Sequence, residues 1–217
     1  MKQVKSKQRV TDHGEVFTSE REVNAMLDLV KQETERIDSR FLEPACGTGN
    51  FLTEILRRKL VVIFDNYRKS QIECEKYLVQ GVGSIYGIDL LQDNVLECRQ
   101  RLFDIFKSQY RRQFKDNGTE DFEKIIEYIL SKNIVCGDAL TMRTVDGTPI
   151  VFPEWSLVID CMVKRRDFSF SELIEARGKQ TSIFDAGWYK VGNKAEFVPN
   201  PVKEYSAVHY RQLIQND

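Results

Sequence analysis

The residues best suited to chemistry lie in one short stretch, residues 41–52, which reads FLEPACGTGNFL. Two apolar residues lead to an acid, Glu43, and a turn of small residues follows before apolar spacing resumes. This order is typical of a buried strand, a tight glycine turn and a helix N-terminus with free N–H donors. We therefore expect a ligand cradle in which Glu43 favours hydroxyls or a cation over a bare phosphate. The GxGxxG and GxxxxGK spacings of dinucleotide sites and phosphate-binding loops do not occur here.

Two further acids follow later predicted strands. Residues 84–89 and 133–138 are short apolar runs that end at Asp89 and Asp138. In an open α/β sheet the carboxyl ends of parallel strands meet at one edge, so both carboxylates are expected beside the cradle. Asp89 is then placed to accept two ribose hydroxyls, and Asp138 to accept from an exocyclic amine. A nucleoside with a cationic amino-acid tail would also satisfy Glu43.

The elements that must position these residues can be read from the apolar spacing. We expect a helix from Thr18 or Ser19 to about Arg36, and a long helix from about Asn50 that breaks over residues 67–70, although residues 61–64 also fit a strand. The remaining expected elements are helices over 94–106, 121–132 and 168–176, a fourth strand over 155–159 and a hairpin over 189–197. Strands that alternate with helices predict a doubly wound α/β sheet with its ligand at the carboxyl edge.

Composition limits the function classes. With 217 residues, 41% of them hydrophobic, the chain can bury one good core, and we expect one main domain. A net charge of -1 gives no global basic field, so any contact with nucleic acid must be local or shared with a partner. Five separated cysteines without a CxxC pair predict reduced thiols and no zinc site. No apolar run approaches the roughly 20 residues of a membrane span, which favours a soluble cytoplasmic protein.

Three other features have simple interpretations. Residues 1–12 form a basic arm, and a solvated mobile terminus is favoured over a strip that meets a phosphate backbone. Cys46 lies in the cradle but is expected to be a small packing residue without a nucleophilic role. Phe168 and Phe170 are expected in the core or as helix anchors rather than as base-stacking groups.

Four segments together resemble one enzyme family: EPACGTGNFL, GIDLLQDNVLECR, NIVCGDAL and GEVFTSEREV. They are similar to motifs of the S-adenosylmethionine-dependent DNA methyltransferases that modify the adenine amino group, as in restriction-modification systems. The resemblance covers residues 13–160 and implies a Rossmann-like doubly wound methyltransferase domain, preceded by the arm 1–12 and followed by an extension, 161–217. The implied cofactor-binding residues are Phe17, Thr18, Glu43, Pro44, Ala45, Cys46, Gly47, Thr48, Gly49, Asn50, Phe51, Asp89, Leu90, Asp138 and Ala139.

The resemblance also implies individual roles. Phe17 and Thr18 would flank the methionine part of the cofactor, and Glu43 with the backbone of residues 45–50 would receive its amino and carboxylate groups. Asp89 would hold the ribose, and Leu90 would pack on the adenine. Asp138 would then receive the adenine amine.

The sequence departs from the family after the fourth expected strand. The family places Asn or Asp, two prolines and an aromatic residue there, to hold the acceptor amine and stack on the flipped-out base. Here Asp160 is followed by Cys161, Met162 and Val163, so Asp160 alone remains as a catalytic candidate. Residues 161–217 leave room for at most a minimal remainder of the sheet and of a target-recognition domain. We therefore expect a sheet that is minimal or truncated after strand four.

Three hypotheses remain open from the sequence. The first is an adenine-DNA methyltransferase, active alone or with a second subunit that supplies target recognition. The second is a catalytically inactive module or regulatory subunit that keeps the fold and binds the cofactor. Methylation of RNA or protein is a third, less favoured, hypothesis.

Overall fold

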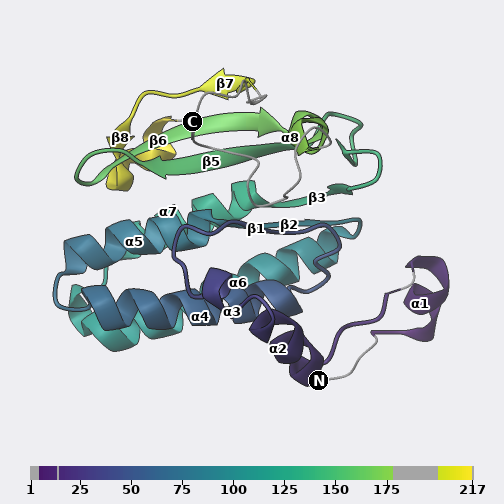
Figure 1. Cartoon of the computed structure of the whole chain (residues 1–217), viewed down its shortest axis with the longest axis horizontal. Coiled ribbons are helices and arrows are strands. Elements are labelled where there is room, and N and C mark those ends of the chain that lie inside the picture. The colour runs from purple at the N-terminus through teal and green to yellow at the C-terminus, as the bar shows by residue number, and fades with distance from the viewer. Residues whose placement is uncertain (1–4, 14, 178–199, 217) are drawn as a thin grey trace.

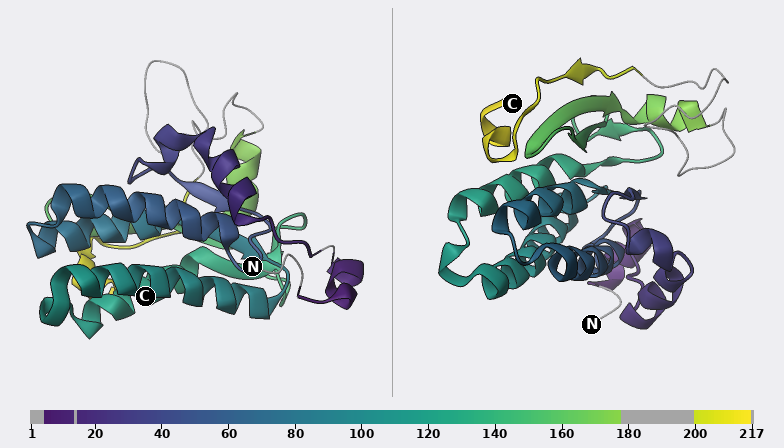
Figure 2. Two further views of the ribbon diagram at one scale, coloured as in Figure 1. Left: turned by 90° about the horizontal axis from the view of Figure 1, so that it is seen from below. Right: turned by 60° about the vertical axis from the view of Figure 1, so that its left-hand side comes forward.

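Three layers make up the part of the chain that the computed structural model describes, residues 5–13, 15–177 and 200–216 (Figure 1). A sheet of four strands, β1–β4, lies in the middle. Helices α4 (Asn50–Tyr67) and α6 (Gln92–Phe114) lie on one side of it, and a second sheet lies on the other, as the right view in Figure 2 also shows. The chain therefore has a mixed α/β architecture.

The middle sheet brings the predicted acids to one edge. Its strands β1 (Phe41–Glu43), β2 (Ile85–Asp89) and β3 (Ile134–Asp138) are parallel, and β4 (Arg143–Thr144) runs antiparallel to β3. Glu43 pairs with Gly87 and Asp89 with Cys136. The three strands thus end at one edge, each on an acidic residue, as the sequence predicted.

The connecting helices follow the apolar spacing closely. Helix α4 ends at Tyr67, and α5 (Gln71–Gly83) begins after Ser70, whose hydroxyl accepts from the Glu73 N–H. The expected break is confirmed, and residues 61–64 are helical. Leu52, Leu56, Leu60 and Ile63 point into the core and are fully buried, which explains why this helix forms although residues 61–64 also fit a strand. Between α6 and β3 lie η1 (Lys115–Asn117) and α7 (Glu120–Asn133).

The second sheet is antiparallel. Strand β5 (Val151–Leu157) pairs with β6 (Met162–Ser169), and β6 also pairs with β7 (Lys203–Glu204) and β8 (Val208–His209). Helix α8 (Phe170–Arg177) follows β6, and η2 (Tyr210–Asn216) follows β8. Phe152 and Phe170 pack on Tyr86 and Ile88 of β2, so this sheet covers the face of the middle sheet opposite α4 and α6.

The expectation that a fourth strand over 155–159 joins the parallel sheet is wrong. Trp155 lies in β5, and β5 belongs to the second sheet rather than extending the parallel one. The cause is burial: Phe152 packs on Tyr86, and the Trp155 Nε1–H donates at 2.9 Å to the Oδ1 of Asn133, the residue before β3. Phe168 and Phe170 are buried, which confirms that they are core residues.

The N-terminal segment is more structured than the sequence indicates. Helix α1 (Lys7–His13) occupies much of the expected mobile arm, and its Arg9 contacts Glu15 and Asp93. Helix α2 (Glu20–Asp28) has Ser19 as its cap, as predicted, with a capping box to Glu22. The predicted continuation to Arg36 is instead a turn and α3 (Lys31–Thr34).

The remaining sequence predictions concern a hairpin, the cysteines and membrane-spanning segments. The hairpin over 189–197 lies outside the described residues. All five cysteines are free thiols. The described helices include none with the length and apolarity needed to cross a bilayer.

A buried carboxylate ties the C-terminal residues to the helices. Glu75 of α5 has no exposed surface and accepts from Tyr110 Oη at 2.6 Å, Tyr210 Oη at 2.7 Å and Arg211 Nη2 at 2.7 Å. Burial acts to raise the pKa of Glu75, but these hydrogen bonds outweigh it and leave the pKa below the ordinary value of 4.5. The interaction therefore stabilises the fold while Glu75 is ionised.

Tyr210→Phe should lower the free energy of unfolding by about 1–3 kcal/mol, because a buried charged oxygen loses one donor. Urea unfolding followed by circular dichroism measures the change. Tyr205→Phe is the matched control, since its hydroxyl makes a longer bond, 3.3 Å, to Asp167. Equal losses in the two variants would contradict the role given to Glu75.

The same site predicts a pH dependence. The pKa of Glu75 is lower in the folded state, so its contribution is present above about pH 4.5 and is lost as pH falls below that value. Tyr210→Phe should unfold at a higher pH than the wild type during acid titration. A lower midpoint in the variant would show that Glu75 does not carry this stability.

Candidate functional site

The glycine turn after β1 has the tight backbone that a ligand cradle requires. Gly47 and Gly49 have φ of 51° and 86°, in the left-handed region. A Cβ on Gly47 would lie 3.1 Å from the Phe17 ring, and one on Gly49 would lie 2.5 Å from Cys98 Sγ. Helix α4 then begins at Asn50, so the predicted strand, turn and helix N-terminus are confirmed.

Asp89 fixes this turn to the end of β2. Its Oδ2 accepts from the Gly47 N–H at 2.8 Å, while Oδ1 accepts from the Leu91 N–H at 2.9 Å and from Asn94 Nδ2 at 3.1 Å. A carboxylate has about four acceptor positions, so these three donors leave about one, on Oδ2. The expectation that Asp89 accepts two ribose hydroxyls is therefore reduced to one hydroxyl in this conformation.

Arg101 of α6 holds the turn from the other side. Its Nη1 donates to Thr48 O at 2.6 Å and to Asn50 Oδ1 at 2.9 Å, and burial lowers its pKa. Asn50 Nδ2 in turn donates to Thr18 O at 2.9 Å. Sequence reasoning missed Arg101, because an arginine on an amphipathic helix gives no local sign that it reaches a loop 53 residues away.

Glu43 is the acid best suited to a cation. The pKa of its carboxyl is raised, because burial disfavours the charged form more than the Ala45 N–H, at 3.4 Å, stabilises it. A positively charged ligand group would relieve that cost. Pro44 and Ala45 are exposed beside it, whereas Phe51 packs against the core.

Cys46 has the environment of a packing residue. Its thiol is buried, and the hydrogen bond with Cys98, together with burial, raises the pKa of Cys46 well above its usual range. The protonated thiol is a poor nucleophile. The burial of Cys46 agrees with the sequence prediction that it is a small packing residue.

Two exposed leucines flank the acids of β2 and β3. Leu90, directly after Asp89, is 56% exposed, and Leu140, two residues after Asp138, is 91% exposed. Asp138 Oδ1 accepts from the Leu140 N–H at 2.8 Å, which closes the turn that contains Ala139. Leu140 was not among the predicted site residues, and together with Leu90 it offers apolar surface at the carboxyl edge.

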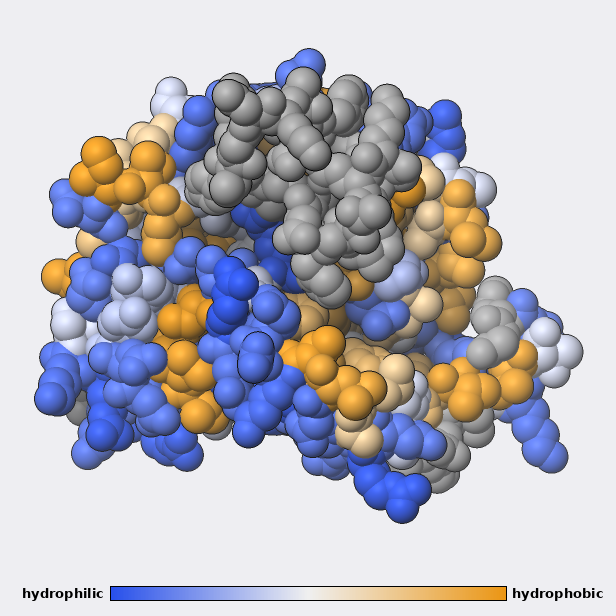
Figure 3. Space-filling model, viewed as in Figure 1, coloured by the Kyte–Doolittle hydropathy of each residue, from blue (hydrophilic) through white to orange (hydrophobic). Residues whose placement is uncertain are grey.

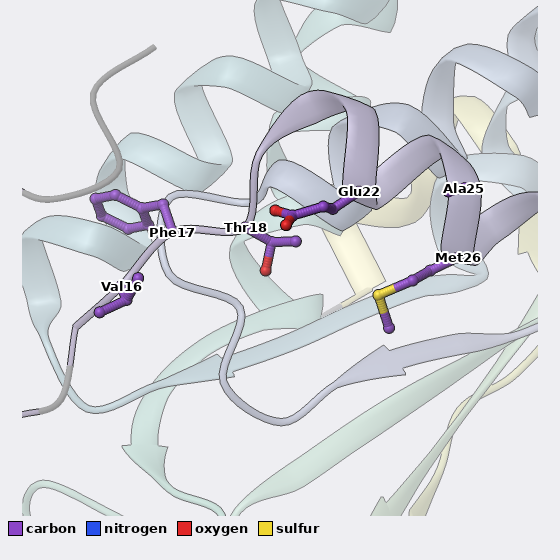
Figure 4. A pocket seen from close by; sticks show the side chains of 6 residues that line it. All are labelled: Val16, Phe17, Thr18, Glu22, Ala25 and Met26. Carbon is purple, nitrogen blue, oxygen red and sulfur yellow. The ribbon is translucent and has the colours of Figure 1, made fainter.

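A cavity of about 500 Å³ adjoins the cradle. Figure 4 shows its lining, from the segment before α2 and from α2 itself: Val16, Phe17, Thr18, Glu22, Ala25 and Met26. Phe17 and Thr18 link it to the cradle through the contacts at Gly47 and Asn50. Of the lining residues, Val16 and Met26 are exposed apolar residues, and apolar surface over this region is visible in Figure 3.

The structure does not bring Asp160 to this site. Strand β5 starts beside Gly137, at the carboxyl end of β3, and reaches Trp155 beside Gly83, which precedes β2. Asp160 follows in the exposed β5–β6 turn, with φ of 51°, beyond the amino ends of the parallel strands. The predicted juxtaposition of Asp160 with the cradle is therefore wrong, because β5 runs antiparallel to the strands that it was expected to join.

The remaining predicted residues do come together. Phe17, Thr18, residues 43–50, Asp89 and Asp138 lie at the carboxyl edge or contact the loop there. Comparisons with protein families, with curated proteins and with solved structures find no match to this chain. A function for the chain must therefore be inferred from the geometry of this edge.

Gly49→Ala should lower the free energy of unfolding by about 2–4 kcal/mol, because left-handed backbone strain adds to the clash with Cys98. Gly147→Ala is the matched control: Gly147 has φ of 82° but no atom within 4 Å of an added Cβ. It should lose about 1 kcal/mol in the same chemical denaturation.

Combining Gly49→Ala with Cys98→Ala tests the cause directly. The double variant should lose less free energy of unfolding than the two single variants lose in sum, because removing the sulfur makes room for the new methyl group. Additive losses would show that the close packing of the cradle on α6 is not responsible.

Proposed function

We propose that this chain binds S-adenosylmethionine at the carboxyl edge of β1–β3, as the cofactor-binding part of an adenine-specific DNA methyltransferase of Rossmann-like type. The observation that carries the proposal is the juxtaposition of the glycine turn with Glu43 and Asp89, with Gly47 hydrogen-bonded to Asp89. A dinucleotide or triphosphate fits less well, because Glu43 would repel its phosphates.

The donor and acceptor set suits each part of this cofactor. Glu43 would receive its ammonium group, and the N–H groups at the start of α4 would receive its carboxylate. Asp89 Oδ2 would accept a ribose hydroxyl, and Leu90 with Leu140 would cover the adenine. Asp138 would accept from the adenine amine. The bound cofactor would supply an electrophilic methyl group on a sulfonium.

The proposed cofactor site lacks the residue that was expected to position a DNA base. Asp160 lies at the opposite edge from the cradle, so it is not available to accept from an acceptor amine beside the cofactor. In this proposal a second polypeptide supplies those polar groups together with target recognition. The cavity beside Phe17 and Met26 adjoins the cradle and would be the space that such a site shares.

The position of Asp160 also favours a second candidate function. A module that binds the cofactor without transferring its methyl group needs the cradle and the strand-end acids but no acceptor-binding residues. Such a chain would act as a structural or regulatory subunit of a methyltransferase. The two functions share the cofactor site and differ in turnover.

Asp89→Asn should weaken S-adenosylmethionine binding roughly 10- to 100-fold, because a charged acceptor for the ribose hydroxyl is lost. Isothermal titration calorimetry measures the dissociation constant, and unfolding curves check that the fold is retained. Asp160→Asn is the control and should bind like the wild type, since Asn tolerates the positive φ of that turn. Failure of the wild type to bind the cofactor would refute the proposal.

Transfer of a labelled methyl group from the cofactor to DNA separates the two functions. The methyltransferase proposal expects label in DNA adenine when a partner subunit is present. Cofactor binding with no label in DNA, across all candidate partners, would favour the non-catalytic module.

A further inference from the structure

The N-terminal segment, here Lys5–His13 together with Glu15, is held to the rest of the chain by polar contacts. Its helix α1 stands apart from the other elements in Figure 1 and in the left view of Figure 2, and residues 5–12 include none that is buried. A helix of seven residues that buries no side chain over residues 7–12 is unstable alone in water. Its position therefore depends on the charges that link it to α6.

Arg9 is the centre of these contacts. Its Nε and Nη2 donate to the two oxygens of Glu15, both at 2.7 Å, and its Nη1 donates to Asp93 Oδ2 at 2.6 Å. Lys5 adds an ion pair with Glu97 at 2.7 Å. The segment thus docks on the first turns of α6, directly after Asp89.

Asn94 connects this docking to the candidate cofactor site. The residue is 1% exposed, and its Nδ2 donates to Glu15 Oε1 at 2.7 Å and to Asp89 Oδ1 at 3.1 Å. Its Oδ1 accepts from Lys5 Nζ at 2.9 Å and from Arg9 Nη2 at 3.1 Å. Every strong hydrogen-bonding position of this side chain is used, and all but one bond lead to the N-terminal segment.

We propose that the N-terminal segment is a positioning element for the cofactor: when it is docked through Arg9 and Glu15, it orients Asn94, and Asn94 holds Asp89 so that the remaining acceptor position of Oδ2 faces the ribose. This inference rests on the proposed function. Docking of the segment and binding of the nucleoside are then linked, and each must favour the other to the same extent.

Because the contact is ionic, the link between docking of the segment and cofactor binding should depend on salt concentration. Asp93 is more than half exposed, and ion pairs of this kind weaken as salt screens them. Raising the salt concentration should therefore release the segment and remove its contribution to cofactor affinity. A role that is merely structural would not give a salt dependence that one side chain controls.

The test compares S-adenosylmethionine affinity among variants by calorimetry. Arg9→Ala should weaken binding roughly tenfold at about 0.02 M salt, and the difference from the wild type should shrink at about 1 M salt. Arg9→Lys should restore part of the affinity, because it keeps the charge but loses the paired geometry. Lys7→Ala is the matched control: it removes one positive charge from the same helix, at an exposed position, and should bind like the wild type.

Hydrogen exchange supplies the reciprocal measurement. The cofactor should slow exchange of the α1 amides in the wild type and have little effect on them in Arg9→Ala. If the wild type binds the cofactor and Arg9→Ala binds it equally well or more tightly at low salt, the inference is wrong and the proposed function stands. If the wild type binds no cofactor, the proposed function fails, and the inference fails with it.

Discussion

The carboxylate of Asp89 is the interaction on which the candidate site depends. Through Gly47, Leu91 and Asn94 it joins the turn after β1, the start of α6 and a buried side chain of α6. The turn contains two residues in left-handed conformations, which favour glycine but do not by themselves select one loop geometry. The Asp89 carboxylate selects the observed loop geometry, because its two oxygens can accept from several N–H groups at once. Arg101 completes the restraint from the opposite side of the loop.

Much of the middle sheet could be predicted because its signals are local. An apolar run that ends on an acid identified each of β1, β2 and β3, and a helical repeat of leucines identified α4. The contacts that complete the site are not local. Asn94 and Arg101 lie on a helix whose polar positions resemble an ordinary solvated face in sequence. Arg9 lies in a basic stretch whose composition is typical of a mobile terminus.

The placement of β5 shows most clearly what could not be predicted from the sequence. The mostly apolar residues from Trp155 to Ile159 predict a strand, but they do not determine its partner strand. The choice depends on which apolar faces meet: Tyr86 and Ile88 present one on β2, and Phe152 with Phe170 covers it. Because the hairpin lies flat on that face, its turn with Asp160 ends at the edge opposite the cradle. Local motifs imply an order of strands only by assumption, so they could not predict that Asp160 lies at the edge opposite the cradle.

The two oxygens of Asp89 have different tasks, and this difference decides what the site can do. Oδ1 is occupied by Leu91 and Asn94, whereas Oδ2 accepts from Gly47 and retains a position for a ligand. A ligand that took both oxygens would have to displace Asn94, and with it the connection to Arg9 and Glu15. A single hydroxyl at Oδ2 leaves that connection intact. Under the proposed function, a nucleoside would be held by one ribose hydroxyl and by its charged tail at Glu43, with the N-terminal segment docked while it is bound.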